Sequence, residues 1–317
     1  MTGHPIRLGI SRCLLGEQVR YDGGHKRDRF LTDVLSRHVE WVPVCPEVEA
    51  GFGIPREAMR LEGGSGSPKL MTIESRRNMT EPMTRFAERK VDALEEADVS
   101  GYVFKQDSPS CGADRVRVFD RQGAAKRSGV GLFARAFIKR FPLIPVEEEG
   151  RLSDPMLREH FIERVFCYHR WRVLARNVPT RQAVIHFHTV HKYLLMAHGA
   201  APYGALGRLV AAAHRYRPVD LVEQYGILFM KALTVMTTRR KQVDVLQHLV
   251  GHLKGRLKPY ERAELNTVIH DYHQGLVPLT VPLTLIKHHV TSYEIEYVRE
   301  QVFLNPYPEE LLLRHHT

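Results

Sequence analysis

The sequence has no long apolar run. Nowhere do about 18 apolar residues follow one another, so no transmembrane helix is predicted. The segment 1–7 lacks the apolar core of a signal peptide, and we therefore expect a cytoplasmic protein without a membrane partner. Cysteine is also scarce, with four in 317 residues. That number is too small for a disulfide framework and suits a reducing compartment.

Common ligand-binding signatures are missing as well. The sequence has no Walker A loop, and the glycine-rich segment 63–66 does not join a strand to a helix at the spacing of a dinucleotide fingerprint. No two cysteines have the CxxC-like spacing that is common in structural zinc sites. These absences argue against a P-loop nucleotide hydrolase, a dinucleotide-binding enzyme and a zinc ribbon.

The first half of the chain, residues 1–150, predicts an α/β domain. Apolar runs indicate strands over 7–11, 41–44, 101–105 and 142–146, and helical spacing indicates helices over 30–35, 80–97 and 131–141. A further strand is expected over 69–74, a hairpin over 115–127, and a linker over 147–150. Strands that alternate with helices predict a Rossmann-like parallel sheet.

Three of the four cysteines lie a short way past the ends of predicted strands. Cys13, Cys45 and Cys111 come just after the runs 7–11, 41–44 and 101–105, and the carboxyl ends of parallel strands meet at one edge of a sheet. We therefore expect these cysteines to converge on one inorganic centre. Thiolates favour zinc, copper(I) or iron–sulfur clusters, and the spacing alone leaves open an iron–sulfur cluster, a zinc ion with an open position, or a dispersed structural role. Cys167 lies in a helical pattern and is interpreted as a core residue.

Polar side chains beside these cysteines are candidates for catalysis. Glu47 follows Cys45 by two residues, and the negative charge of a cluster would raise its pKa towards that of a proton shuttle. The alternative is a structural carboxylate that caps a helix or pairs with Arg56. Ser108 and Ser110 flank Pro109 just before Cys111, where ordinary turn chemistry is the alternative.

Candidates for substrate binding lie in the same segments. Lys105 is a candidate to bind a negative charge on the substrate. The loop after the first strand is rich in glycine and charge, and loops at the ligand edge of a sheet often carry function. We take Tyr21 and Asp22 in this loop, together with Ser110, as substrate-binding candidates.

Three segments carry a resemblance to a known family. SRCLLGEQVRYDGGHK, PVCPEVEAGFGIPR and FKQDSPSCG closely resemble the TudS-like thiouracil desulfidases, over roughly residues 6–146. The resemblance implies a [4Fe–4S] cluster that is bound by Cys13, Cys45 and Cys111 and leaves one iron open. It implies Glu47 and Ser108 as catalytic residues, with Ser110 as the less favoured match for the serine. The implied reaction is hydrolytic, because water steered by Glu47 replaces the sulfur of a thiopyrimidine and sulfide is released.

The second half, residues 151–317, predicts an all-helical domain of about seven helices and is strongly basic. It holds 22 Lys and Arg against 14 Asp and Glu, a net charge of +8, whereas residues 1–150 hold 24 against 22, a net charge of +2. An excess of this kind suits a polyanionic partner such as nucleic acid, and a plain solvated surface is the alternative.

Several residues of this half are candidates for tRNA binding. Arg239, Arg240 and Lys241 stand at a predicted helix start, where free N–H groups also favour phosphate. Arg170 and Arg172 flank Trp171, which suits RNA, although a solvated helix face is the alternative for each. The histidines of the segment HFHTVH, residues 186–191, lack nearby carboxylates, so packing or RNA contacts are favoured over a metal.

The second half resembles the YbgA-like helical domain. Fusions of this domain to the desulfidase domain resemble RudS-type enzymes, which remove sulfur from 4-thiouridine in tRNA. The resemblance thus implies a tRNA substrate, and the basic charge agrees with it. The alternatives are a desulfidase of free thiouracils and a non-enzymatic iron–sulfur or zinc protein that binds RNA.

Overall fold

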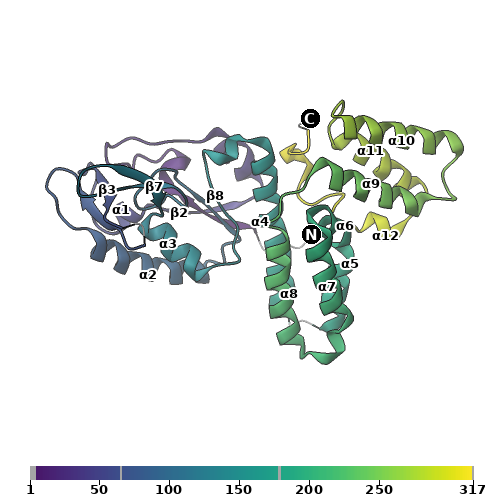
Figure 1. The fold of residues 1–317 in the computed structure, drawn as a ribbon, viewed down its shortest axis with the longest axis horizontal. Coiled ribbons are helices and arrows are strands. Elements are labelled where there is room, and N and C mark those ends of the chain that lie inside the picture. Colours follow the sequence, from purple (N-terminus) through teal and green to yellow (C-terminus); the bar gives the residue numbers. More distant parts are fainter. Residues whose placement is uncertain (1–4, 65, 178–179, 316–317) are drawn as a thin grey trace. The chain divides into compact units, whose positions relative to one another are not determined.

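The computed structural model describes residues 5–64, 66–177 and 180–315. The chain divides into two compact units, Met1–Phe161 and Ile162–Thr317. The division falls within helix α4 (Pro155–Arg176), eleven residues after the end of the expected linker. The first unit combines sheets with helices and the second is helical (Figure 1). The predicted fold class, an α/β domain followed by an all-helical one, is confirmed.

The main sheet of the first unit is parallel, as predicted. Its strands are β1 (Arg7–Ser11), β2 (Glu40–Val44), β5 (Gly101–Phe104) and β8 (Val146–Glu148), and their order is β2-β1-β5-β8. β1 pairs in parallel with both β2 and β5, and β5 pairs in parallel with β8. The carboxyl ends of β1, β2 and β5 therefore share one edge of the sheet.

Aromatic side chains fill the core beneath this sheet. The rings of Tyr102 and Phe104 on β5 stack with 4.1 Å between their centroids. They pack against Phe133 and Phe137 of α3 (Leu132–Arg140), and all four side chains are fully buried. Helix α2 (Thr80–Glu96) packs beside α3 through its apolar face. The core thus fixes β5, the strand that leads to Cys111.

A second four-stranded sheet was expected only in part. Its strands are β3 (Met59–Glu62), β4 (Lys69–Thr72), β6 (Val116–Phe119) and β7 (Ala125–Gly129), in the order β4-β3-β6-β7. The predicted hairpin is confirmed as the antiparallel pair β6–β7. Strand β3 and its parallel pairing with β6 were not predicted, because the two strands lie more than fifty residues apart in the sequence.

Two local predictions for the first unit are corrected. The segment expected as an α-helix over 30–35 is a π-helix, Phe30–Val34, followed by a 3-10 turn, Leu35–Arg37. The expected linker over 147–150 instead supplies most of β8, and the last strand lies later than predicted. Glu148 is buried there, and its carboxylate accepts the backbone N–H of Ala113 at 2.8 Å. Glu147 forms an ion pair with Arg151 at 2.7 Å.

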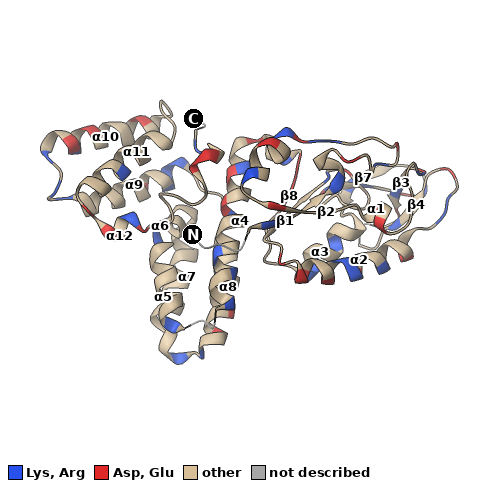
Figure 2. Ribbon diagram, turned by 180° about the vertical axis from the view of Figure 1, so that it is seen from behind, with Lys and Arg blue, Asp and Glu red and all other residues tan. Residues whose placement is uncertain are grey.

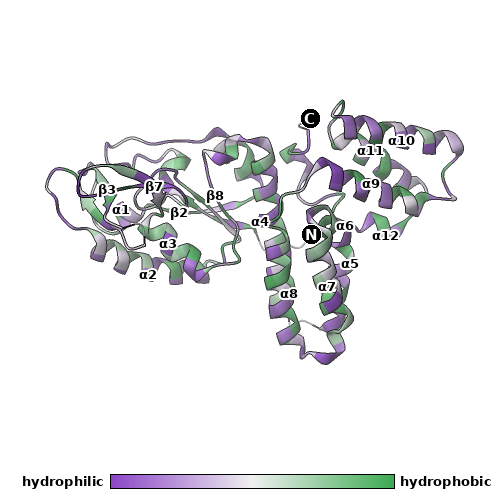
Figure 3. Cartoon of the chain, viewed as in Figure 1, coloured by the Kyte–Doolittle hydropathy of each residue, from purple (hydrophilic) through white to green (hydrophobic). Residues whose placement is uncertain are grey.

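The second unit is built from helices that pack around aromatic residues. After α4 come α5 (Arg181–Val190), α6 (Lys192–His198), α7 (Ala200–Ala211), α8 (Pro218–Ala232), α9 (Arg239–Leu253), α10 (Pro259–Gln274), α11 (Thr280–Ser292) and α12 (Glu296–Arg299). Helices α5 and α6 follow one another directly and meet at His191. Hydrophobic and hydrophilic residues alternate along helices such as α8 (Figure 3). The ring of Tyr225 on this helix lies 5.2 Å from that of Trp171, between centroids. Among the described residues, no helix is both long and apolar enough to cross a membrane.

The close approach of β1 to the core can be tested at Gly9. A Cβ atom at Gly9 would lie 2.1 Å from Cδ2 of Tyr102, whose side chain is fully buried and cannot move away. We expect Gly9→Ala to lower the free energy of unfolding by about 1–3 kcal/mol, measured by urea denaturation. Gly64→Ala is the matched control, because nothing lies within 4 Å of its Cβ position. Equal stability of the two variants would contradict this account.

Candidate active site

The carboxyl ends of three parallel strands open into one cavity of about 400 Å³. Cys13 lies in the 3-10 turn Arg12–Leu15 after β1, Cys45 lies between β2 and α1 (Pro46–Glu49), and Cys111 lies in the turn after β5. All three line the cavity, and each is at most 9 % exposed. The sheet therefore brings together the three cysteines that the sequence places at strand ends.

Burial keeps these thiols neutral. It raises the pKa of Cys13 to about 11, raises that of Cys45, and raises that of Cys111 well above its ordinary value. A hydrogen bond with Ser11 opposes the effect at Cys111. A soft metal centre would displace the protons and bind the thiolates. Among the residues described, no group of three His, Cys, Asp or Glu side chains has the geometry to hold a single metal ion.

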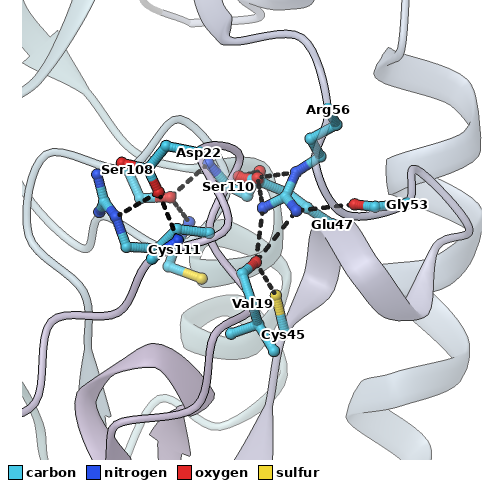
Figure 4. A network of polar contacts seen from close by, with 11 residues as sticks. Val19, Asp22, Cys45, Glu47, Gly53, Arg56, Ser108, Ser110 and Cys111 are labelled. Atoms are coloured by element: carbon cyan, nitrogen blue, oxygen red, sulfur yellow. Dashed lines mark hydrogen bonds and ion pairs between the residues drawn. The ribbon is translucent and has the colours of Figure 1, made fainter.

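Glu47 is held on the cavity wall by two partners (Figure 4). Its Oε2 accepts hydrogen bonds from Nε and Nη2 of Arg56, at 2.8 and 2.5 Å. Its Oε1 accepts a hydrogen bond from Oγ of Ser110 at 2.8 Å. The side chains of Glu47 and Arg56 are 13 % and 6 % exposed, so this ion pair is largely buried. The carboxylate is fixed in orientation and remains next to the space where a substrate would lie.

Arg56 connects several segments around the cavity. Besides Glu47, its guanidinium donates to the carbonyl oxygens of Val19, at 3.1 Å, and Gly53, at 3.0 Å. The Val19 oxygen also lies 3.7 Å from Sγ of Cys45. The pairing of Glu47 with Arg56 was foreseen only as a structural alternative, and its role as a junction between the loop after β1 and the turn after β2 was missed. The signal in the sequence was the presence of both residues in one motif, nine positions apart.

The two serines before Cys111 occupy different places (Figure 4). Ser108 lines the cavity, and its Oγ accepts the backbone N–H of Cys111 at 3.0 Å and of Ser110 at 3.3 Å. Ser110 is fully buried and lies outside the cavity lining, with its hydroxyl directed to Glu47. Ser108 is thus placed to contact a substrate, whereas Ser110 supports Glu47 from behind.

Lys105 lies on the cavity wall with its charge already matched. Its Nζ forms an ion pair with Glu149 and donates to the carbonyl of Gln106 at 3.0 Å. Glu149, which was expected in the linker, also accepts the backbone N–H of Gln106 at 2.7 Å. Lys105 therefore presents a neutral pair rather than a lone positive charge.

The loop after β1 contributes Tyr21 to the cavity but not Asp22. Tyr21 lines the cavity and is 43 % exposed, with the guanidinium of Arg20 at 5.4 Å from its ring centroid. Asp22 is exposed and lies outside the lining. The backbone N–H of Gly24 donates to its carboxylate at 2.9 Å, which lowers the pKa of Asp22.

In the second unit, the candidate tRNA-binding residues at the start of α9 differ in how many contacts their side chains make within the protein. Thr238 caps the helix by accepting the N–H of Lys241 at 3.4 Å. Nζ of Lys241 donates to the carbonyl of His198 at 2.7 Å, and the guanidinium of Arg239 lies 5.6 Å from the ring centroid of Tyr272. Arg240 is exposed. Of the three, Arg240 has the side chain most open to a partner.

The candidates on α4 are less accessible. Arg170 and Arg172 are half-buried, and Nη1 of Arg170 donates to the carbonyl of Pro306 at 2.8 Å. Trp171 is 5 % exposed and packs against Phe187 and Tyr225, so it has no free face on which a base could stack.

Two of the histidines in residues 186–191, His188 and His191, are buried and packed, as the packing interpretation predicts. Nδ1 of His188 lies 3.1 Å from the hydroxyl of Tyr225, and Nδ1 of His191 lies 2.7 Å from the carbonyl of Phe187.

Comparisons with known proteins match each half of the chain separately. The family model for 2-thiouracil desulfurase matches residues 8–149, and that for a protein of unknown function, DUF1722, matches residues 192–308. YbbK of Bacillus subtilis is 30 % identical over 109 residues, which are 33 % of this chain and 72 % of YbbK. YbgA of Escherichia coli is 29 % identical over 153 residues, which are 48 % of this chain and 90 % of YbgA. A solved structure, the [4Fe–4S]-dependent thiouracil desulfidase TudS, is 28 % identical, with a TM-score of 0.39, over 47 % of this chain and 93 % of that one.

The buried ion pair of Glu47 can be tested by removing its cation. Arg56→Met leaves the Glu47 carboxylate and the Val19 carbonyl without their donor in a site that excludes most water. We expect the free energy of unfolding to fall by about 3–5 kcal/mol, measured by urea denaturation.

A matched control is Arg76→Met, which breaks the pair of Glu62 with an arginine that is 52 % exposed. The expected loss there is below about 1 kcal/mol. Similar small losses in both variants would show that Arg56 does not act as a junction.

Proposed function

The chain belongs to the 2-thiouracil desulfurase family and carries a YbgA-like helical domain after it, and from this premise we propose that it is a [4Fe–4S]-dependent desulfidase of 4-thiouridine in tRNA. One observation carries the proposal. Three buried thiols and a fixed carboxylate line a single cavity at the carboxyl edge of a parallel sheet. We place the activity in the cytoplasm.

The donor set fits an iron–sulfur cluster. Cys13, Cys45 and Cys111 come from three separate turns and surround one cavity, and soft sulfur donors are the usual ligands of such clusters. These three residues would hold the cluster and leave one iron without a protein ligand. When bound, that iron would supply Lewis-acid chemistry for the sulfur of a thiocarbonyl.

In this proposal Glu47 moves the proton of the attacking water. The reaction takes up one water, replaces C4=S by C4=O and releases hydrogen sulfide, so no electrons are gained or lost. Glu47 accepts a proton from the water as its oxygen bonds to C4, and returns it as the bond between carbon and sulfur breaks. Arg56 and Ser110 hold the carboxylate in the required direction.

The remaining cavity residues orient the pyrimidine. The hydroxyl of Ser108 lies on the cavity wall. Its oxygen already accepts the backbone N–H of Cys111 within the same turn, so the hydroxyl hydrogen is available to donate to the base or the water. Tyr21 offers an exposed ring at the rim on which the base can stack. Ser110 has a positioning role through Glu47, and Lys105, which is paired with Glu149, balances charge at the wall.

A tRNA substrate accounts for the basic second half of the chain. A free base of this size needs no second domain with a net charge of +8. A base within folded tRNA must be turned out of its stack, and contacts with phosphates hold the RNA while it opens. The rival is a desulfidase of free thiouracils, which the name of the family favours.

The chemistry is tested with anaerobically reconstituted protein and thiolated tRNA. We expect loss of the 4-thiouridine absorbance with release of equimolar sulfide, and about four irons per chain. Glu47→Gln should lower kcat by about 100-fold or more at unchanged iron content, since it removes the proton acceptor. Cys111→Ser should lose iron. Glu88→Gln, at an exposed position of α2, is the control and should retain full activity. Unchanged absorbance with the wild-type protein would refute the proposal.

The substrate is tested by its response to salt. For tRNA we expect kcat/KM to fall steeply between 50 and 200 mM salt, because bound phosphates release counterions. For free 4-thiouracil it should change little. Arg240→Gln should weaken turnover of tRNA alone, by about two- to fivefold, because one phosphate contact is lost. Faster turnover of the free base than of tRNA at every salt concentration would favour the rival.

A further inference from the structure

The basic excess of the first 150 residues is concentrated in one hairpin. Residues 115–129, which contain β6 and β7, hold five Lys and Arg and a single acidic residue, Asp120. That acid is used within the turn, where it accepts the backbone N–H groups of Gln122 and Ala124, each at 2.9 Å. The hairpin has a net charge of +4, whereas residues 1–150 together have +2. The rest of this half is therefore slightly acidic.

Two arginines of the hairpin lie directly opposite each other. Arg117 on β6 and Arg127 on β7 are partners in the antiparallel register, and both are exposed. Like charges in this position destabilise a strand pair. Asp107 relieves Arg127, with 3.0 Å between Nη1 and Oδ1. The side chain of Arg117 has no ion-pair or hydrogen-bond partner among the described residues. An exposed site that keeps this repulsion indicates a ligand that supplies negative charge.

Strand β3, which pairs with β6, adds residues to the same face of the sheet as Arg117. Val116, Val118 and Leu61 are buried, so Arg117, Phe119 and Arg60 alternate to the other side of the sheet, which we call the outer face. The acid on this face, Glu62, pairs with both Arg60 and Arg76. The guanidinium of Arg60 also lies 4.6 Å from the ring centroid of Phe119.

The outer face begins at the mouth of the active-site cavity. Asp107, the partner of Arg127, is part of the cavity lining. Figure 2 shows Lys and Arg in blue on the strands β3, β4 and β7 of this sheet. A strand of nucleic acid that delivers a nucleotide to the cavity would thus meet positive charge immediately beside it.

We propose that the outer face of the β3–β6–β7 sheet, with Arg117 and Arg127 at its centre, binds the phosphodiester backbone of RNA beside the nucleotide that enters the cavity. The inference rests on the proposed function and adds a contact surface within the catalytic unit itself. Charge complementarity identifies the occupant. Exposed guanidinium groups on neighbouring strands of a sheet suit a chain of phosphates rather than a single small anion.

The test uses Arg117→Gln in the full-length protein with its cluster. Arg117 is chosen because its loss leaves the pair of Arg127 and Asp107, and hence the cavity wall, untouched. The control is Arg89→Gln, an exposed arginine of α2 whose side chain also has no hydrogen-bond or ion-pair partner among the described residues. Affinity for unmodified tRNA is measured by fluorescence anisotropy over a series of salt concentrations. Turnover is measured with thiolated tRNA and with the free 4-thiouridine nucleoside.

We expect Arg117→Gln to weaken tRNA binding about three- to tenfold at 100 mM salt and to reduce the slope of log Kd against log salt by about one. Its kcat/KM for the free nucleoside should equal that of the wild type, and its Tm should be equal or higher, because a like-charge pair is removed. Arg89→Gln should match the wild type throughout.

Wild-type affinity for tRNA in Arg117→Gln would overturn the proposal, and so would an equal loss with the free nucleoside or a lower Tm. Competition by poly-glutamate as effective as that by RNA at equal charge would also overturn it, in favour of an acidic protein partner. Binding of unmodified tRNA needs no chemistry. A wild-type protein that releases no sulfide would therefore refute the proposed function, while the anisotropy arm still decides the role of the hairpin.

Discussion

The buried ion pair of Glu47 and Arg56 is the contact on which the architecture of the cavity depends. The guanidinium of Arg56 reaches the carboxylate of Glu47 and the carbonyl of Val19, and so joins the turn after β2 to the loop after β1. Such a pair loses its hydration when the chain folds, and it is tolerated because every donor finds an acceptor. The same contacts that compensate for burial also orient a carboxylate beside three thiols. Stability and chemistry therefore rest on one set of hydrogen bonds.

The parallel sheet supplies the frame for this junction. Cys13, Cys45 and Cys111 are far apart in the sequence, and only the adjacency of β1, β2 and β5 brings them to one edge. The aromatic core under β5 makes that edge rigid, because stacked and edge-on rings leave no room for a shift of the strand. A centre that needs several ligands from separate turns requires this kind of support.

Positive charge is distributed over the chain in a way that packing alone does not require. The second half has most of the excess, and in the first half it collects on the hairpin at the mouth of the cavity. Opposed arginines on neighbouring strands cost stability, and proteins accept such costs where a surface binds a ligand. Within our proposal, the two basic regions serve the same polyanion: one holds the body of the RNA and the other holds the strand at the reacting base.

The sequence by itself determined the fold class, most of the strands and helices, and the kinds of donor at the strand ends. The apolar runs 7–11 and 101–105 are local signals for strands. They predict that the cysteine after each run lies at the carboxyl end of a strand in a parallel sheet. The pairing of side chains across the fold was decided by the tertiary structure. Glu149, which resembled part of a charged linker, pairs with Lys105 because β8 joins the edge of the sheet. Trp171, which stands between two arginines in the sequence, is buried because its face of α4 packs against α8. Ser110 and Ser108 are two residues apart, and only the turn around Pro109 directs one to Glu47 and the other to the cavity. Contacts of this kind depend on register and packing between distant segments, and local sequence carries no record of either.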